Sequence, residues 1–350
     1  MNKAADSLGI DPQRLYEQLE KVILGRPRTF NRVQVAEQAG VPLDRAVELW
    51  KALGFPATDS DDEVLYTEAD SEALRLVDGL VESGFIDPDV ELTLVRSMGR
   101  SFARLAEWEI AELVSAAMSG SMLTDQARLE GLISSLVPQI EQIQNYVWRR
   151  HIANAAGRML LFPGGEDGVQ MAVGFADIVG FTRRSRGMTA DELSRLVEVF
   201  EATSARLITE HHGRIIKTIG DEVLFVTDSA PEAARLALDL VDAHQVDPDF
   251  PEVRVGVAYG DVMTRLGDVF GPVVNIASRL TSLSKPCRVL VDRGMNRELK
   301  PLEEEFRLRR GRTATVKGYA RLDTYSLKRP RSGGRLDSLR ETLDASVLPR

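Results

Sequence analysis

Cysteine and histidine are scarce in this sequence of 350 residues, which contains one cysteine, Cys287, and four histidines. A single cysteine excludes an internal disulfide and a cysteine-based zinc site, and it suits a reducing compartment. No apolar run approaches the ~20 residues of a membrane-spanning helix, and the first residues lack the pattern of a signal peptide. We therefore expect a soluble cytoplasmic protein without a membrane span.

Basic residues are outnumbered by acidic ones: the sequence has 44 Lys and Arg and 53 Asp and Glu, which give a net charge of −9. This acidic balance argues against a general nucleic-acid binder, because contacts with phosphates need a basic face. A nucleotide can still bind if metal ions supply the positive charge. The chain is long enough for two globular domains.

The first half of the chain is predicted to be almost entirely helical, and a long helix over 88–119 carries a broad apolar face. The polar loop from Pro163 to Gly168 is the best candidate for a domain boundary. We expect a helical domain over residues 1–162, a second domain over 163–328 and a flexible tail over 329–350.

Residues 33–53 form a helix, a glycine turn and a second helix, which is the outline of a helix-turn-helix motif. An ordinary pair of packed helices explains this better, because the second helix is not basic. Its charged residues are Asp44, Arg45, Glu48 and Lys51. A DNA-binding regulator that uses residues 30–55 remains an alternative.

Strands and helices alternate after residue 168. Their order, strand-helix-strand-strand-helix-strand, predicts a ferredoxin-like α+β fold. Within it, the stretch from Arg214 to Val226 reads as a hairpin with a Gly-Asp turn. Lys217 on its leading strand could form a plain ion pair with Asp221 in the turn.

Asp177 lies where the first strand of this half gives way to a turn and a helix. The backbone N–H groups of residues 180–182 can then face an anion. Asp177 and Asp221 would lie at neighbouring strand ends. Two aspartates without histidine or thiolate form a hard oxygen site that suits Mg²⁺ or Mn²⁺.

Three segments together resemble the signature blocks of the class III nucleotidyl cyclase catalytic domain. They read Phe-Ala-Asp-Ile-Val-Gly-Phe-Thr over 175–182, Lys-Thr-Ile-Gly-Asp-Glu over 217–222 and Asp-Val-Phe-Gly-Pro-Val-Val-Asn-Ile-Ala-Ser-Arg-Leu over 268–280. The resemblance covers roughly residues 168–328. It implies a cyclase that forms a cyclic nucleotide and pyrophosphate from a nucleoside triphosphate.

The resemblance also implies roles for individual residues. Asp177, Ile178 and Asp221 would hold two divalent cations, Mg²⁺ or Mn²⁺. Lys217 and Asp268 match the pair that reads the purine, and a Lys donor with an Asp acceptor favours adenine, hence ATP as substrate. An adenylate cyclase is therefore expected, with a guanylate cyclase as the alternative.

The remaining matched residues contact the ribose and the phosphates in this family. The resemblance assigns Asn275 and Arg279 to the ribose and to the transferring phosphorus, Phe181 and Thr182 to substrate binding, and Lys317 to the terminal phosphates. Structural alternatives are a helix cap for Asn275, a surface ion pair for Arg279 and a solvated strand position for Lys317. A diguanylate cyclase is disfavoured because the Gly-Gly-Asp/Glu-Glu-Phe turn of that family is absent.

In this family the site lies between two catalytic domains, so a homodimer with two interfacial sites is implied. The helical half resembles regulatory domains that precede some actinobacterial cyclases. We expect it to dimerise and to control the orientation of the catalytic halves. His151 could provide a pH input, although an ordinary surface histidine is the simpler interpretation, and a small apolar ligand could bind in this half.

Overall fold

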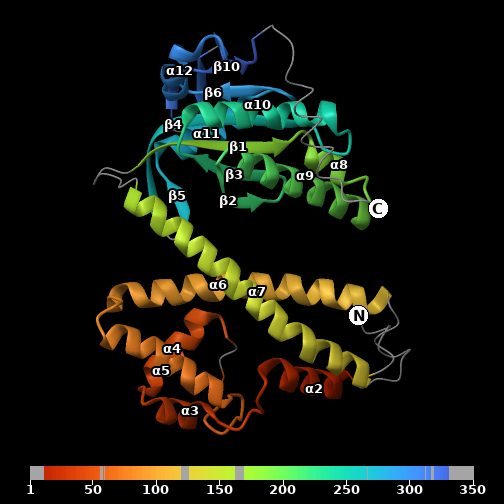
Figure 1. Cartoon of the computed structure of the whole chain (residues 1–350), viewed down its shortest axis with the longest axis vertical. Coiled ribbons are helices and arrows are strands. Elements are labelled where there is room, and N and C mark those ends of the chain that lie inside the picture. Colours follow the sequence, from red (N-terminus) through yellow and green to blue (C-terminus); the bar gives the residue numbers. More distant parts are fainter. Residues whose placement is uncertain are drawn as a thin grey trace. The chain divides into compact units, whose positions relative to one another are not determined.

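The computed structural model describes residues 12–55, 58, 60–119, 126–161, 169–265, 267–311, 313–316 and 319–330. The chain divides into two compact units, Met1–Arg158 and Met159–Arg350 (Figure 1). The first unit is helical, and the second is built around one large sheet.

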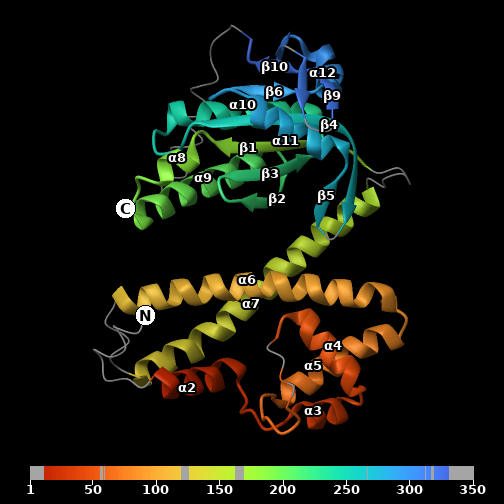
Figure 2. The same ribbon diagram turned by 180° about the vertical axis from the view of Figure 1, so that it is seen from behind.

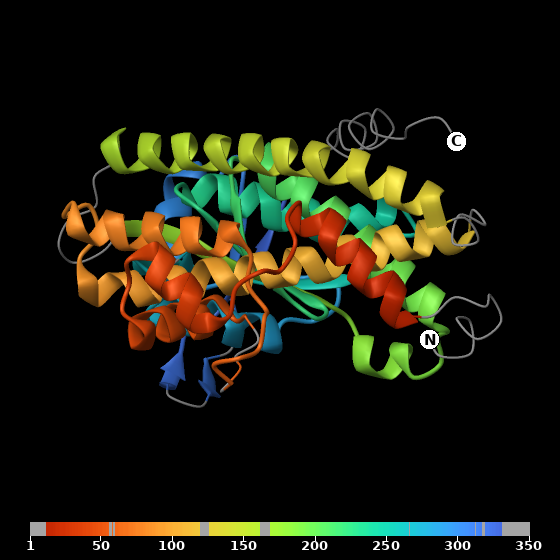
Figure 3. The same cartoon turned by 90° about the horizontal axis from the view of Figure 1, so that it is seen from below.

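The first unit contains six helices in its described part. They are α2 (Pro12–Leu24), α3 (Arg32–Ala39), α4 (Leu43–Leu53), α5 (Glu68–Glu82), α6 (Pro88–Ser119) and α7 (Gln126–Leu161). The long helices α6 and α7 run in opposite directions (Figure 3). The side-chain amide of Gln144 on α7 donates to Glu109 on α6 at 2.9 Å, which joins the two helices.

Helices α3 and α4 reproduce the predicted helix-turn-helix outline. Asn31 caps α3 in a capping box with Gln34, and Gly40 ends the helix at a φ of 76°, which favours glycine. Trp50 stacks on Tyr66 with ring centroids 4.4 Å apart, within a small apolar core that α5 and α6 complete. The first unit therefore has a hydrophobic core of its own.

The second unit alternates strands and helices. Its first part contains β1 (Val169–Ile178), α8 (Phe181–Ser185), α9 (Ala190–Glu210), β2 (Arg214–Ile219), β3 (Glu222–Thr227), α10 (Ala230–Val246), β4 (Val253–Arg265), β5 (Asp268–Phe270) and α11 (Pro272–Leu283). Its second part contains β6 (Val289–Val291), α12 (Arg293–Leu299), a 3₁₀ turn (Lys300–Leu302), β7 (Arg307–Arg310), β8 (Ala314–Val316), β9 (Tyr319–Leu322) and β10 (Tyr325–Lys328).

The main sheet has the strand order β2-β3-β1-β4-β6-β10-β7. Its first four strands are antiparallel neighbours, and with α9 and α10 they form the predicted ferredoxin-like core. Strand β6 adds to β4 in parallel, and β5 pairs with the end of β4 that continues past the sheet (Figure 2). The α+β prediction is confirmed.

Alternate residues of β1 face two separate cores, as the period of a strand requires. Ala172 and Ala176 join the core that α9, α10 and α12 cover, whereas Val173 and Phe175 join the core beneath α11. Because both faces are buried, β1 is fixed in position, and so is the turn that follows it.

The last two strands, β9 and β10, follow each other closely in the chain but belong to different sheets. The break falls at Thr324, whose carbonyl accepts a hydrogen bond from the Gly311 amide at 2.7 Å. This hydrogen bond extends the pairing of β10 with β7.

Candidate active site

Asp177 and Asp221 are brought together by the pairing of β1 with the β2–β3 hairpin. Asp177 lies opposite Glu222 in the strand register, and the Ile178 amide donates to the Asp221 carbonyl at 3.0 Å. Gly220, at a φ of 65°, forms the tight turn before Asp221. The two aspartates predicted to hold metal therefore lie at one edge of the sheet, with Ile178, the third predicted ligand, beside them.

Like charges accumulate at this edge. Burial first, then Asp177 and Asp221, raise the pKa of the Glu222 carboxyl to about 7. Burial also raises the pKa of Asp177, although the guanidinium of Arg254 opposes this shift from a distance of 2.5 Å between Nε and Oδ2. Three carboxyl groups thus share one close cation, an arrangement that a divalent cation would stabilise.

These residues form an open oxygen site and not a complete metal cage. Within the described ranges, no group of three His, Cys, Asp or Glu side chains is arranged to hold a metal ion by itself. Mg²⁺ is usually held by one or two carboxylates together with water and substrate phosphates. Two aspartates and a backbone carbonyl fit that pattern, so the donor set suits a metal that arrives with a nucleotide.

The turn after Ile178 leads into the short helix α8. Gly180 adopts a φ of 67° and caps this helix, and its carbonyl accepts from the amides of Arg183 and Arg184. Phe181 packs partly against the core, and Thr182 is exposed. The predicted phosphate-facing residues thus directly follow the candidate metal ligands.

Lys217 and Asp268 form an ion pair that joins β2 to β5. The Lys217 Nζ lies 2.5 Å from Asp268 Oδ2, and both side chains remain partly exposed. Burial alone would raise the pKa of Asp268, but hydrogen bonds from Lys217 and from the Val269 amide outweigh burial and lower it. Lys217 is therefore paired with the predicted base-reading partner and not with Asp221.

Asn275 and Arg279 lie one turn apart on α11. This helix begins at Pro272 after Gly271, so Asn275 is not its N-cap. Neither side chain has a hydrogen bond or ion pair to another described residue, and Arg279 is therefore available to an anion. Lys317, the last predicted site residue, lies outside the described residues.

The position of α11 is set by a close contact with the sheet. A Cβ atom at Gly256 on β4 would lie 2.2 Å from the backbone nitrogen of Thr281 on α11. Thr281 is buried, and its hydroxyl donates to the Ala277 carbonyl at 3.0 Å. Only glycine allows this approach, which fixes the helix that carries Asn275 and Arg279.

The sequence alone assigns no role to two residues at the site. Arg254 lies on β4 opposite Asp177, and Glu222 follows Asp221 within a recognised segment. The Val-Arg-Val alternation over 253–255 indicates only a strand. The β1–β4 register is what places Arg254 against Asp177, and no local pattern encodes that register.

Comparison with known proteins gives two family matches that cover most of the chain. Residues 166–329 match the adenylate and guanylate cyclase catalytic domain, and residues 12–153 match the adenylate cyclase regulatory domain. No helix in the described part of the chain is long and apolar enough to cross a membrane.

Similar proteins come from several actinobacteria. An adenylate cyclase of Streptomyces coelicolor is 44% identical over 296 residues, which cover 83% of this chain and 76% of the relative. One from Glutamicibacter nicotianae is 39% identical, covering 90% of this chain and 83% of the relative. A pH-sensitive adenylate cyclase of Mycobacterium tuberculosis is 32% identical, covering 83% and 80%.

Proposed function

Because the chain belongs to the adenylate and guanylate cyclase family, we propose that it is an adenylate cyclase that converts ATP to 3′,5′-cyclic AMP and pyrophosphate. The observation that carries the choice of ATP is the contact between Lys217 and Asp268. An ammonium group donates and a carboxylate accepts, so the pair can meet the N1 acceptor and the amino group of adenine. Guanine presents the opposite pattern at that edge.

Asp177 and Asp221, with the backbone carbonyl of Ile178, would hold two divalent cations, Mg²⁺ or Mn²⁺. When bound, such ions activate the ribose 3′-hydroxyl and neutralise the triphosphate. The clustered carboxyl groups support this assignment, since Asp177 and Asp221 together contribute to the raised pKa of Glu222. Arg254 adds a fixed cation to the same edge.

Asn275 and Arg279 would act at the reacting end of the substrate. Asn275 orients the ribose, and Arg279 stabilises the charge that develops on the α-phosphate as the 3′-hydroxyl attacks it. The absence of a described partner for Arg279 supports this role, because a preorganised cation must be free to meet its anion. Phe181 and Thr182 would face the phosphates, and Lys317 would contact the terminal ones.

A homodimer would complete the site. Each chain carries the metal group and the base-reading group once, and two antiparallel chains would form two equivalent sites. Apolar side chains near Lys217 and Asp268 support this assembly, since they are partly exposed in one chain. They are Ile215 (40% exposed), Ile219 (52%), Met263 (57%) and Phe270 (44%).

The regulatory domain, over residues 1–162, would control how the catalytic domains over residues 163–328 dock. Helix α7 supports this role, because large apolar side chains along it are exposed and need a partner. They are Ile143, Tyr146, Val147, Trp148 and Ile152. A second copy of the helix would bury them.

Inputs to the regulatory domain stay predictions. His151 lies on α7 and is exposed. A groove of ≈ 530 Å³ beside α4 is lined largely by charged side chains, which does not favour an apolar ligand there. Its lining includes Asp44, Arg45, Glu48, Lys51 and Arg96.

The DNA-binding alternative is weakened by the surface of α4. Arg45 is engaged by Asp78 at 2.7 Å and by the buried Glu91 at 3.0 Å. Asp44, Glu48 and Lys51 remain exposed on the helix, so this face is acidic overall and would repel phosphates. A gel-shift assay at moderate salt that detects specific DNA binding would revive the alternative.

Product analysis with Mn²⁺-ATP and Mn²⁺-GTP tests the activity. We expect cyclic AMP as the main product and loss of activity in Asp221→Ala. Cyclic GMP as the main product would refute the base assignment, and full activity in Asp221→Ala would refute the metal assignment. Deleting residues 1–160 tests regulation, since unchanged activity and unchanged dimerisation would exclude it.

A further inference from the structure

The β2–β3 hairpin carries Lys217 on its first strand and Asp221 at its tip, and its base lies between two helices. The chain enters the hairpin from the C-terminus of α9 and leaves it toward the N-terminus of α10. His211 is the residue that caps the C-terminus of α9. A bond between these two helix ends would therefore close the base of the hairpin.

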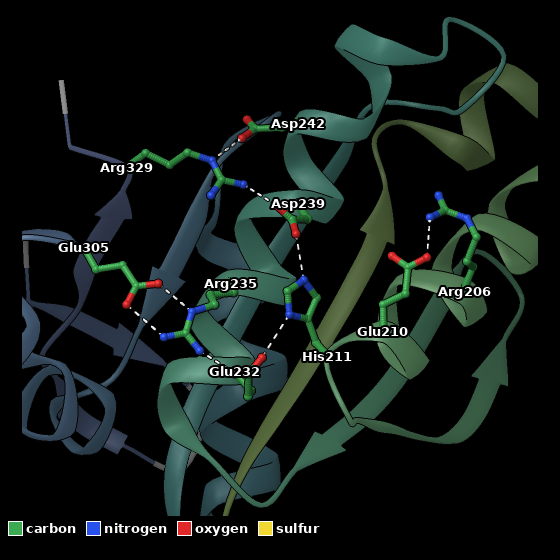
Figure 4. A network of polar contacts seen from close by, with 9 residues as sticks. All are labelled: Arg206, Glu210, His211, Glu232, Arg235, Asp239, Asp242, Glu305 and Arg329. Carbon is green, nitrogen blue, oxygen red and sulfur yellow. Dashed lines mark hydrogen bonds and ion pairs between the residues drawn. The ribbon is translucent and has the colours of Figure 1, made fainter. Parts of the chain in front are cut away.

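His211 makes that bond with both ring nitrogens. Its Nδ1 lies 3.0 Å from Glu232 Oε2 in the first turn of α10, and its Nε2 lies 2.7 Å from Asp239 Oδ2 two turns further along (Figure 4). The His211 side chain is only 12% exposed. One side chain thus joins the entrance of the hairpin to two positions on the helix at its exit.

The carboxylates that face His211 also contact two arginines. Arg329, which directly follows β10, contacts Asp239 and lies 2.9 Å from Asp242. Arg235 on α10 contacts Glu232 and binds Glu305, before β7, through two hydrogen bonds of 2.5 and 2.8 Å. Figure 4 shows these groups as one connected cluster, whereas the pair Arg206–Glu210 stands apart.

We propose that His211 is a positioning residue for the active site, and that together with Glu232, Asp239 and Arg329 it forms a clasp that fixes the base of the β2–β3 hairpin. The proposal rests on the proposed function, in which the hairpin supplies Lys217 to read the base and Asp221 to hold metal. Because Arg329 directly follows β10, the clasp also couples the position of the hairpin to the C-terminal end of that strand.

Charge and hydrogen bonding both favour a protonated His211. A neutral imidazole donates through only one nitrogen, yet both nitrogens of His211 face a carboxylate. Burial lowers the pKa of His211, but the hydrogen bonds and charges of Asp239 and Glu232 outweigh burial and raise it. In addition, the cluster holds four carboxylates against two arginines, so the imidazolium reduces its excess negative charge.

The backbone at this corner is strained and therefore depends on the contacts that hold it. His212 has a φ of 55°, which non-glycine residues rarely adopt, and a Cβ at Gly213 would lie 2.9 Å from the Ile208 carbonyl oxygen. Without the clasp this corner would relax, and the strand that begins at Arg214 would shift with it. Base reading and metal binding would then weaken together.

The experiment compares His211→Gln and Arg329→Gln in the full chain with Arg206→Gln. The control removes a neighbouring ion pair of 2.9 Å on α9 that does not belong to the clasp. Glutamine at 211 is neutral and cannot donate to both carboxylates. The readouts are the Mn²⁺ concentration for half-maximal activity, the KM for ATP, the preference for ATP over GTP, and hydrogen–deuterium exchange of peptides covering 214–227.

In both clasp variants, we expect the Mn²⁺ requirement and the KM to rise by roughly three- to tenfold, with faster exchange in the hairpin than in α11. The control should stay within about twofold of the wild type in every readout. Unchanged Mn²⁺ and ATP dependences with unchanged hairpin exchange would overturn the proposal.

If His211→Gln does not fold, Arg329→Gln decides the question alone. Hydrogen exchange needs no turnover, so it tests the clasp even if the wild type makes no cyclic AMP. An inactive wild type whose clasp variants show faster hairpin exchange would refute the proposed function and not the clasp.

Discussion

Glu222 should destabilise the metal-free protein at neutral and alkaline pH. Its carboxyl lies beside Asp177 and Asp221, and burial together with these charges raises its pKa from 4.5 to about 7. A carboxyl whose pKa is higher in the folded state costs no stability below pH 4.5, where both states are protonated. The cost grows as pH rises from 4.5 to 7 and is complete above 7.

The expected magnitude follows from that difference. A pKa difference of one unit corresponds to about 1.4 kcal/mol, so the rise in the pKa of Glu222 from 4.5 to about 7 gives an upper bound of about 3.4 kcal/mol for the lost stability. Glu222 is only partly buried, and solvent screening reduces the value to about 1–2 kcal/mol. We therefore expect Glu222→Gln to stabilise the second unit by that amount at pH 8 in EDTA, with little pH-dependent gain near pH 4.5.

The assay must report on the second unit. All three tryptophans, Trp50, Trp108 and Trp148, lie in the first unit, so their fluorescence would miss this transition. Hydrogen–deuterium exchange of peptides from β1 and β3 across a urea series would measure it. A gain that is equal at pH 4.5 and pH 8, or a loss of stability at pH 8, would refute the electrostatic reasoning.

Three further predictions follow from single contacts. Arg254→Gln removes the close cation of Asp177, so kcat/KM for ATP at pH 7 should fall by about tenfold or more. Steady-state kinetics would measure this fall, and a smaller change would contradict the role of Arg254. Gly256→Ala should displace α11, which would lower kcat and reduce the free energy of unfolding in urea by about 1–3 kcal/mol. An unchanged kcat would contradict the inference that the close contact at Gly256 positions α11. His211 has a raised pKa, so its stabilising effect should be complete below the ordinary value of about 6.5 and be lost as pH rises through the raised one. Hairpin exchange at pH 6 and pH 9, corrected for intrinsic rates, should show this loss in the wild type but not in His211→Gln.

Much of the fold and part of the site can be predicted from local sequence. The α+β order, the hairpin turn at Gly220 and the neighbouring positions of Asp177 and Asp221 follow from strand and turn patterns. The pairing of Lys217 with Asp268 agrees with the resemblance to the cyclase family, although the two residues are 51 positions apart in the sequence. Local patterns suffice for Asp177 and Asp221 because each lies at a strand end or a turn, whereas the partner of Lys217 follows only from the resemblance to the cyclase family.

The rest depends on contacts between distant segments. Arg254 reaches Asp177 through a register that joins residues 77 apart, and Arg329 reaches Asp239 across 90 residues. Nothing in the sequence near His211 indicates that two carboxylates of α10 will face it. The raised pKa of Glu222 likewise results from burial and neighbouring charges, which only the folded chain provides.

The central claim is that two chains assemble the ATP site between them. Its most direct test measures cyclic AMP made by co-expressed Asp221→Ala and Arg279→Ala chains, each of which should be inactive alone. In the proposed dimer each site takes Asp221 from one chain and Arg279 from the other. Half of the dimers would be mixed and would contain one intact site, so the mixture should regain about a quarter of wild-type activity. A mixture as inactive as its two components would contradict the account.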